Sequence, residues 1–209
     1  MVQQPVSIKM FRLARTVPLL SLCLLLPAVA AVLDFEEYMQ RAGASKRRGD
    51  WQSAASQYAQ AINHPDLPKA GAERSLVHLE YGRAVGALCQ FGEAEKYLLM
   101  AREIADRAGS SSFASLYELG GISVAQRKFT DALGYFSQMA QLAAKEPART
   151  APPQLLADAW EKYAAALDAT GKPDEAQQRR LDAQKLRDAD PKAAVAGTTI
   201  AYAQRCAKP

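Results

Sequence analysis

Histidine and cysteine are scarce in this chain, which has two histidines and three cysteines among 209 residues. His64 and His78 stand far from each other in the sequence, and no spacing typical of a zinc site occurs. The glycines of ELGGIS and TGKPDEA lack the spacing of dinucleotide and phosphate loops. We can assemble no constellation of nucleophile, base and orienting group. The sequence therefore predicts no enzyme, no cofactor and no metal site.

Patterns typical of β-strands are also rare. Val, Ile and Thr are sparse outside a few segments, alanine is abundant, and little strand-like alternation of apolar and polar residues occurs. With 49% hydrophobic and 8% aromatic residues, the chain can nevertheless bury a substantial core. These features predict an all-α protein.

A surplus of positive charge is missing once the N-terminus is set aside. Residues 1–30 contain three basic residues and no acidic one, so 23 basic and 22 acidic residues remain. A nucleic-acid-binding protein needs a basic surface to neutralise phosphates. The charge balance therefore predicts no nucleic-acid partner.

The N-terminal segment is apolar and follows three basic residues. Thr16 to Leu33 carries no charge and contains the run LLSLCLLL, followed by Pro27 and small residues up to Ala30. This order is typical of a secretory signal peptide. We expect residues 1–30 to be cleaved, from a start at Met1 or Met10. The mature chain would be periplasmic or secreted without membrane insertion; the alternative is a membrane anchor formed by an uncleaved N-terminal helix.

Cys89 and Cys206 are the two cysteines outside this segment. In an exported protein they could form a disulfide, but no spacing motif requires it. Cys89 falls at the end of a predicted helix, where we expect a buried, small apolar residue. Whether the two cysteines pair is left open by the sequence.

A short amphipathic pattern occurs four times, in residues 49–62, 90–101, 127–140 and 171–183. The alanines at its centre are 40, 38 and 44 positions apart, a period typical of a solenoid; they are Ala54, Ala94, Ala132 and Ala176. A small residue that would let two helices approach closely stands twelve positions before each alanine: Ala42, Gly82, Gly120 and Ala164.

These motifs resemble the tetratricopeptide repeat (TPR) family. The resemblance rests on the pairs Tyr81-Gly82, Leu119-Gly120 and Tyr163-Ala164, and on F-x-x-A or W-x-x-A in the helices that follow. It implies an all-α, right-handed α-solenoid of about four helix-turn-helix repeats. The repeat domain would span residues 31–190, with units at about 35–68, 72–108, 112–147 and 153–190. Units near 40 residues exceed the usual length of about 34, as in the long-helix variants of kinesin light chains.

The end of the array departs from the repeat pattern. Pro173 replaces the aromatic residue of the fourth copy and Arg180 its large apolar residue, which favours a solubilising cap. Residues 191–209 form a C-terminal tail that we expect to cap the array. Ile200 and Tyr202 would then cover the last helix.

The resemblance implies a concave groove lined by the first helix of each repeat, which would bind a protein or peptide. The residues expected to bind the partner there are Met39, Lys46, Arg47, Leu79, Arg83, Tyr117, Asp158 and Glu161. Gly43, Gly121 and Asp168 are expected beside them. Basic groups near the first repeat and acidic groups near the last predict a polarised trough, with Tyr117 as a flat contact between them.

Two functions remain open on this reading. The first is a non-catalytic scaffold for protein–protein interaction in the cell envelope, which holds a peptide or partner protein in the groove. The alternative is an accessory or assembly factor of an envelope or pilus machine, which would be anchored to the membrane if the N-terminal helix is kept.

Overall fold

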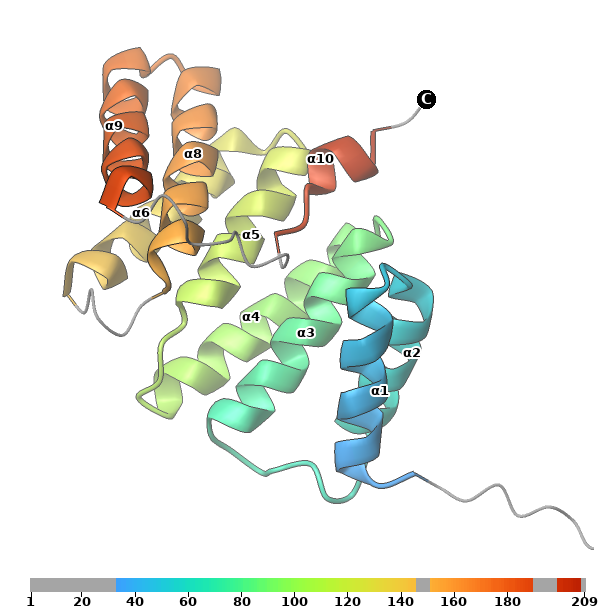
Figure 1. Ribbon diagram of the computed structural model, residues 1–209. Helices are drawn as coiled ribbons and strands as arrows, with labels where there is room; N and C mark the ends of the chain where they lie inside the picture. The colour runs from blue at the N-terminus through green and yellow to red at the C-terminus, as the bar shows by residue number, and fades with distance from the viewer. Residues whose placement is uncertain (1–32, 146–150, 190–198, 208–209) are drawn as a thin grey trace, which may run out of the picture. The chain divides into compact units, whose positions relative to one another are not determined.

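The computed structural model describes residues 33–145, 151–189 and 199–207. The expected signal peptide, its cleavage at Ala30 and the two candidate starts therefore lie outside the described residues. Within them every regular element is a helix, and neighbouring helices form pairs joined by short connections (Figure 1). The elements are α1 (Phe35–Arg47), α2 (Trp51–Ile62), α3 (Ala72–Ala87), α4 (Phe91–Arg107), α5 (Phe113–Ala125), α6 (Phe129–Lys145), α8 (Pro153–Ala169), α9 (Pro173–Ala189) and α10 (Tyr202–Arg205).

The helix pairs stack in chain order. The most extensive contacts lie within the pairs α1–α2, α3–α4, α5–α6 and α8–α9, and each pair also packs against the next. The first helices contact one another from α3 to α5 and from α5 to α8. This is the solenoid arrangement expected from the repeat, in which each pair buries its apolar face against its neighbours.

The turn inside each pair has one recurring backbone conformation. A residue with positive φ lies five positions before each repeat alanine; these residues are Gly49, Cys89, Arg127 and Gly171, with φ of 75°, 65°, 61° and 76°. The next residue donates its N–H to the carbonyl oxygen five positions back, as from Lys128 to Ser123 at 2.9 Å. This bond belongs to the Schellman motif, whose left-handed position favours glycine. Two of the four turns place a larger residue there.

Arg127→Gly should therefore stabilise the protein by about 0.5 to 1 kcal/mol. An L-residue in the left-handed region costs about 1 to 2 kcal/mol, but glycine loses more chain entropy on folding, which offsets part of the gain. Arg127→Ala is the matched control, since it removes the same side chain but keeps a Cβ at φ 61°. Urea denaturation of both variants measures the effect. Equal gains from glycine and alanine would show that the arginine side chain, and not the backbone, sets the cost.

The pairs α3–α4 and α5–α6 each have a close contact between a glycine of the first helix and a large residue of the second. A Cβ on Gly82 would stand 2.9 Å from Cγ of Leu98, and a Cβ on Gly120 would stand 2.6 Å from Cζ of Phe136. Leu98 and Phe136 are fully buried, each four positions after its repeat alanine. The repeat motif is thus a packing contact, as the sequence indicated.

The last pair presents a polar surface. Pro173 begins α9 after the turn at Gly171, and Ala176 and Ala183 are the buried residues of this helix. Arg180, in the place of the large apolar residue, forms an ion pair with Asp168. Such a surface suits the last pair, because no further helix pair covers it among the described residues.

Candidate functional site

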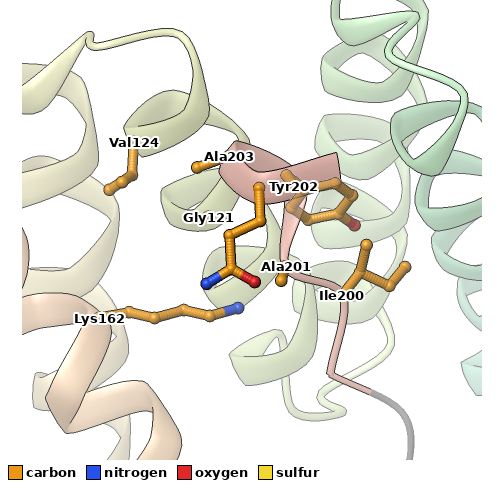
Figure 2. Close-up of a pocket in the computed structure, with 8 residues that line it drawn as sticks. Gly121, Val124, Lys162, Ile200, Ala201, Tyr202 and Ala203 are labelled. Carbon is orange, nitrogen blue, oxygen red and sulfur yellow. The ribbon is translucent and has the colours of Figure 1, made fainter. Parts of the chain in front are cut away.

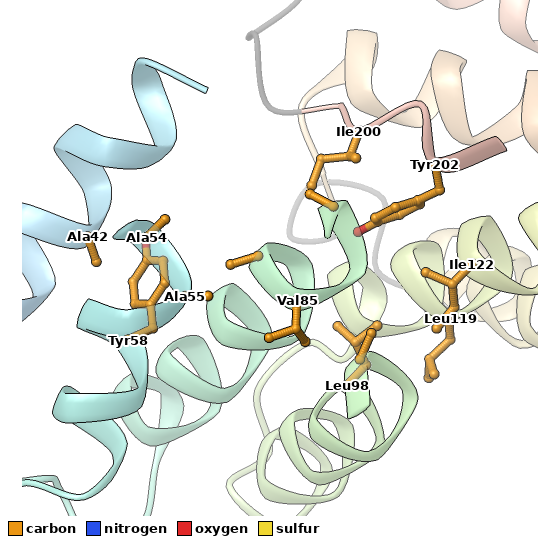
Figure 3. Packing of buried hydrophobic residues seen from close by; sticks show 13 residues of the cluster. Ala42, Ala54, Ala55, Tyr58, Val85, Leu98, Leu119, Ile122, Ile200 and Tyr202 are labelled. Carbon is orange, nitrogen blue, oxygen red and sulfur yellow. The ribbon is translucent and has the colours of Figure 1, made fainter. Parts of the chain in front are cut away.

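The C-terminal segment, which we define as residues 199–207, lies on the first helices α3 and α5. Ile200 and Tyr202 are 5% and 2% exposed, and both join the core cluster that contains Val85 and Leu119. Figure 3 shows these two side chains reaching from the segment toward the helices of that cluster. The expectation that they cover the last helix is therefore wrong. Instead, the segment lies on the face formed by the first helices of the pairs, which we call the inner face, and contacts α3 and α5 of the two middle pairs.

Tyr202 enters a slot that two glycines leave open. A Cβ on Gly86 would stand 3.0 Å from Cε1 of the ring, and a Cβ on Gly121 would stand 3.4 Å from Cδ2. The Phe91 ring meets the Tyr202 ring edge-on, at 6.5 Å between centroids. At the bottom of the slot the hydroxyl donates to Oε2 of Glu118 at 2.7 Å. Burial, and then the charge of Glu118, raise the pKa of Tyr202 well above its usual value.

Polar contacts hold both ends of the segment. Thr199 donates to Oδ2 of Asp158 on α8 at 3.2 Å. Nε of Arg205 donates to the carbonyl oxygen of Ala87 at 2.6 Å, and its guanidinium lies 5.7 Å from the centroid of the Trp51 ring. The segment therefore makes contacts to residues of α2, α3, α5 and α8.

A disulfide joins Cys206 of the segment to Cys89 in the turn between α3 and α4. The sequence left this pairing open. Cys89 is exposed and bonded, so the expectation of a buried apolar thiol at this position is wrong. The bond closes a loop between residues 117 positions apart.

Beneath the segment, ion pairs link the first helices. Nζ of Lys46 on α1 lies 2.8 Å from Oε2 of Glu80 on α3. Arg83 reaches Oε1 of Glu80 at 3.0 Å and Oε1 of Glu118 on α5 at 2.9 Å. Burial alone would lower the pKa of Arg83, but the carboxylates of Glu118 and Glu80 outweigh it and raise that pKa. Arg83 and Glu118 are 8% and 2% exposed, so Glu118 is a buried acceptor that is already ion-paired when Tyr202 reaches it.

Lys162 of α8 lies beside this network and forms no ion pair with the residues that the structure describes. Its Nζ stands 4.1 Å from the centroid of the Tyr117 ring and has no hydrogen-bond partner among the described residues. It borders a cavity of about 170 Å³ that Gly121 and Val124 share with the C-terminal segment (Figure 2). Burial lowers the pKa of Lys162, although the charges of Glu118 and Asp158 oppose the shift. Its ammonium form is thus less stable in the fold than in water.

Lys162→Met should leave the free energy of unfolding at neutral pH unchanged or raise it by up to about 1 kcal/mol, because an apolar chain of similar length avoids burying a charge. The pKa of Lys162 is lowered in the fold, so between that pKa and the usual 10.5 the unfolded chain binds the extra proton. The parent should gain stability as pH rises through this window, and the variant should lack that gain. Urea midpoints between pH 7 and 10.5 test this. A clear loss of stability at pH 7 would show that the cation is net attractive.

The residues that the sequence predicted to line the groove lie in different environments in the structure. Met39 and Leu79 are partly buried against the core, and Arg47 is exposed. Tyr117 is 2% exposed beneath Lys162, so it offers no open flat surface. On α8, Asp158 and Glu161 both meet Arg187 of α9, at 3.4 and 2.8 Å. Together with the pairing of Lys46 and Arg83, these contacts neutralise the polarised trough expected from the sequence.

Three charged residues of the inner face were missed, although the repeat register contains the signal. They lie two positions before the small residue of their unit and are Glu80, Glu118 and Lys162. Residues two positions apart lie on different faces of a helix, so a position that is charged in three units faces away from the close contact made by the small residue and toward the neighbouring first helices. The segment around Tyr202 had no such signal, because it lies outside the repeats.

The described helices match TPR-like solenoid structures. The crystal structure of BtubC (BKLC) from P. vanneervenii superposes with a TM-score of 0.68 at 18% sequence identity, over 77% of this chain and 65% of that one. The chain thus spans less than two thirds of that protein. The crystal structure of MamA gives a TM-score of 0.46 at 15% identity, over 77% and 97% of the two chains. No protein-family model and no curated protein matches the sequence.

At this level of identity the likeness establishes the fold alone, which is an all-α solenoid of TPR-like helix pairs. Among the described residues, no group of histidine, cysteine and carboxylate side chains could hold a metal ion. None of the helices in the same ranges is long and apolar enough to cross a membrane.

Proposed function

We propose that this chain is a non-catalytic scaffold for protein–protein interaction, which holds a peptide segment or partner protein on the inner face of α1, α3, α5 and α8. One observation carries the proposal. The C-terminal segment lies on this face with two buried side chains, Ile200 and Tyr202, and with side-chain hydrogen bonds to Glu118, Asp158 and Ala87. A face that binds one peptide segment in this way has the apolar pockets and polar groups that recognition of a peptide requires.

We further propose that the scaffold works in the periplasm or outside the cell. The basic and apolar pattern of residues 1–30 supports export. The Cys89–Cys206 disulfide adds support, because disulfides persist in oxidising compartments and are rare in the cytosol. Mass spectrometry of the mature N-terminus tests the proposal. A start near residue 31 is expected, whereas an intact Met1 or Met10 on a soluble chain would contradict cleavage.

The interaction itself is tested with the purified mature chain, both oxidised and reduced, immobilised as bait in envelope extract, followed by binding kinetics with the recovered partner. Arg47→Glu changes an exposed residue of α1 that the resemblance to TPR proteins assigns to the groove, and Lys145→Glu makes the same charge reversal at the end of α6. Arg47→Glu should change the association rate several-fold and its salt dependence, and Lys145→Glu should not.

If only Lys145→Glu affects binding, the partner contacts the outer helices and the inner-face proposal fails. The identity of the recovered partner distinguishes a general scaffold from an assembly factor of an envelope or pilus machine, because an assembly factor used as bait would capture components of that machine.

A further inference from the structure

The C-terminal segment is held in the way that a bound peptide is held. Its one helical turn, α10, has four residues, too few to be stable alone in water. Ala201, Ala203 and Gln204 are exposed, whereas Ile200 and Tyr202 are buried on α3 and α5. The order of the segment therefore depends on its two anchors and its bond to Cys89.

The Tyr202 slot selects a tyrosine by shape and by charge. Gly86 and Gly121, on two different helices, make room for a flat ring: a Cβ on Gly86 would crowd the ring at 3.0 Å, and a Cβ on Gly121 would be in van der Waals contact with it at 3.4 Å. Glu118 then accepts the phenolic hydrogen at 2.7 Å at the closed end. A phenylalanine would fit the slot but leave a buried carboxylate oxygen without this donor. Sites built to hydrogen-bond a hydroxyl reject the analogue that lacks it.

The second anchor fixes the spacing of the recognised sequence. Ile200 precedes Tyr202 by two residues, and both belong to one cluster of buried side chains. The residue between them, Ala201, is exposed, so the site places no requirement on the side chain at this position. The buried anchors of the segment are therefore an aliphatic residue and, two positions later, a tyrosine.

The disulfide lies at the edge of this site. Cys89 occupies the left-handed position of its turn, where Gly49 and Gly171 stand in two other repeats. The backbone there favours glycine, so the turn itself gives no reason for a cysteine. Its bond to Cys206 gives one, because it ties the segment to the site that the segment fills.

We infer that the Tyr202 site is an exchangeable peptide site whose partner is a protein segment with an aliphatic residue two positions before a tyrosine, and that the Cys89–Cys206 bond keeps the chain's own segment in place of that partner. A dithiol reductant opens the bond by two successive thiol–disulfide exchanges, which leave two thiols on the chain and a disulfide on the reductant. The freed segment then competes with the partner as an untied ligand. The inference rests on the proposed interaction function and specifies its ligand and its control.

The test uses the full chain and a fluorescein-labelled peptide TIAYAQR, the sequence of residues 199–205. The untied variant carries Cys89→Gly and Cys206→Ser, which removes the bond and suits the backbone of the turn. The vacated variant adds Ile200→Ser and Tyr202→Ala, which removes both anchors. Fluorescence anisotropy measures peptide binding, and circular dichroism confirms that each variant keeps its helices.

The vacated variant should bind the peptide most tightly, the untied variant more weakly because its own segment competes, and the oxidised parent not measurably. The peptide with Tyr202→Phe should bind the vacated variant at least about 10-fold more weakly, through the lost hydrogen bond to a charged group. The peptide with Tyr202→Ala should show no saturable binding.

Failure of the folded vacated variant to bind, or equal binding of the tyrosine and phenylalanine peptides, would overturn the inference. If the vacated variant does not fold, the untied variant decides, because peptide binding equal to that of the oxidised parent overturns the inference as well. A partner that the bait captures but TIAYAQR does not displace from the untied variant would contradict this site while leaving the scaffold function intact.

Discussion

Gly120→Ala should lower the free energy of unfolding by about 2 to 3 kcal/mol, whereas Gly134→Ala should raise it by about 0.5 to 1 kcal/mol. Alanine has the higher helix propensity at both positions, so packing alone decides the sign. A Cβ on Gly120 would overlap the Phe136 ring, which is fully buried and lies against Tyr163 at 5.7 Å between centroids. A Cβ on Gly134, in α6, would meet nothing within 4 Å.

Urea denaturation at equal protein concentration measures both changes. Because the substitution is the same and both glycines are helical, each variant is the control for the other. Two changes of the same sign would show that Gly120 is not at the close contact between α5 and α6.

Loss of the disulfide, through Cys89→Ser with Cys206→Ser, should lower the free energy of unfolding by about 2 to 5 kcal/mol. The bond closes a loop of 117 positions, so breaking it returns a large amount of chain entropy to the unfolded state. It also frees a segment whose order depends on it. The pair Cys89→Gly with Cys206→Ser should lose up to about 1 kcal/mol less, because glycine relieves the left-handed turn.

Urea denaturation of the parent, with and without a reductant, completes the comparison. The reduced parent should unfold at nearly the same urea concentration as the serine variant. If reduction changes the free energy of unfolding by less than about 0.5 kcal/mol, the bond contributes nothing to the fold.

The repeat architecture could be predicted because its determinants are local and periodic. Ala54, Ala94, Ala132 and Ala176 mark second helices, and all four are fully buried. Their spacing also revealed the close helix contacts, because each alanine has a small residue twelve positions earlier. In the second and third repeats that small residue contacts the large residue four positions after the alanine.

The inner face could be predicted only in part, because its contacts join residues that are far apart in the sequence. Lys46, Arg83 and Asp158 could be assigned to first helices, but their ion-pair partners depend on how those helices stack. Tyr202 reaches Glu118 across 84 positions, and no periodicity connects a tail to the repeats before it. The pairing of Cys89 with Cys206 is non-local for the same reason.

The central claim is that the disulfide keeps the C-terminal segment on the inner face. Hydrogen exchange, measured by mass spectrometry on the oxidised and the reduced parent, tests this claim most directly. Peptides from α5, which forms the floor of the Tyr202 site, are the reference in the same sample. In the oxidised chain residues 199–207 should exchange slowly. After reduction they should exchange at least about 10-fold faster than α5, because the segment opens without unfolding the repeats. If the segment and α5 remain equally protected in the reduced chain, the segment is a permanent part of the core and the inner face is not a site that exchanges ligands.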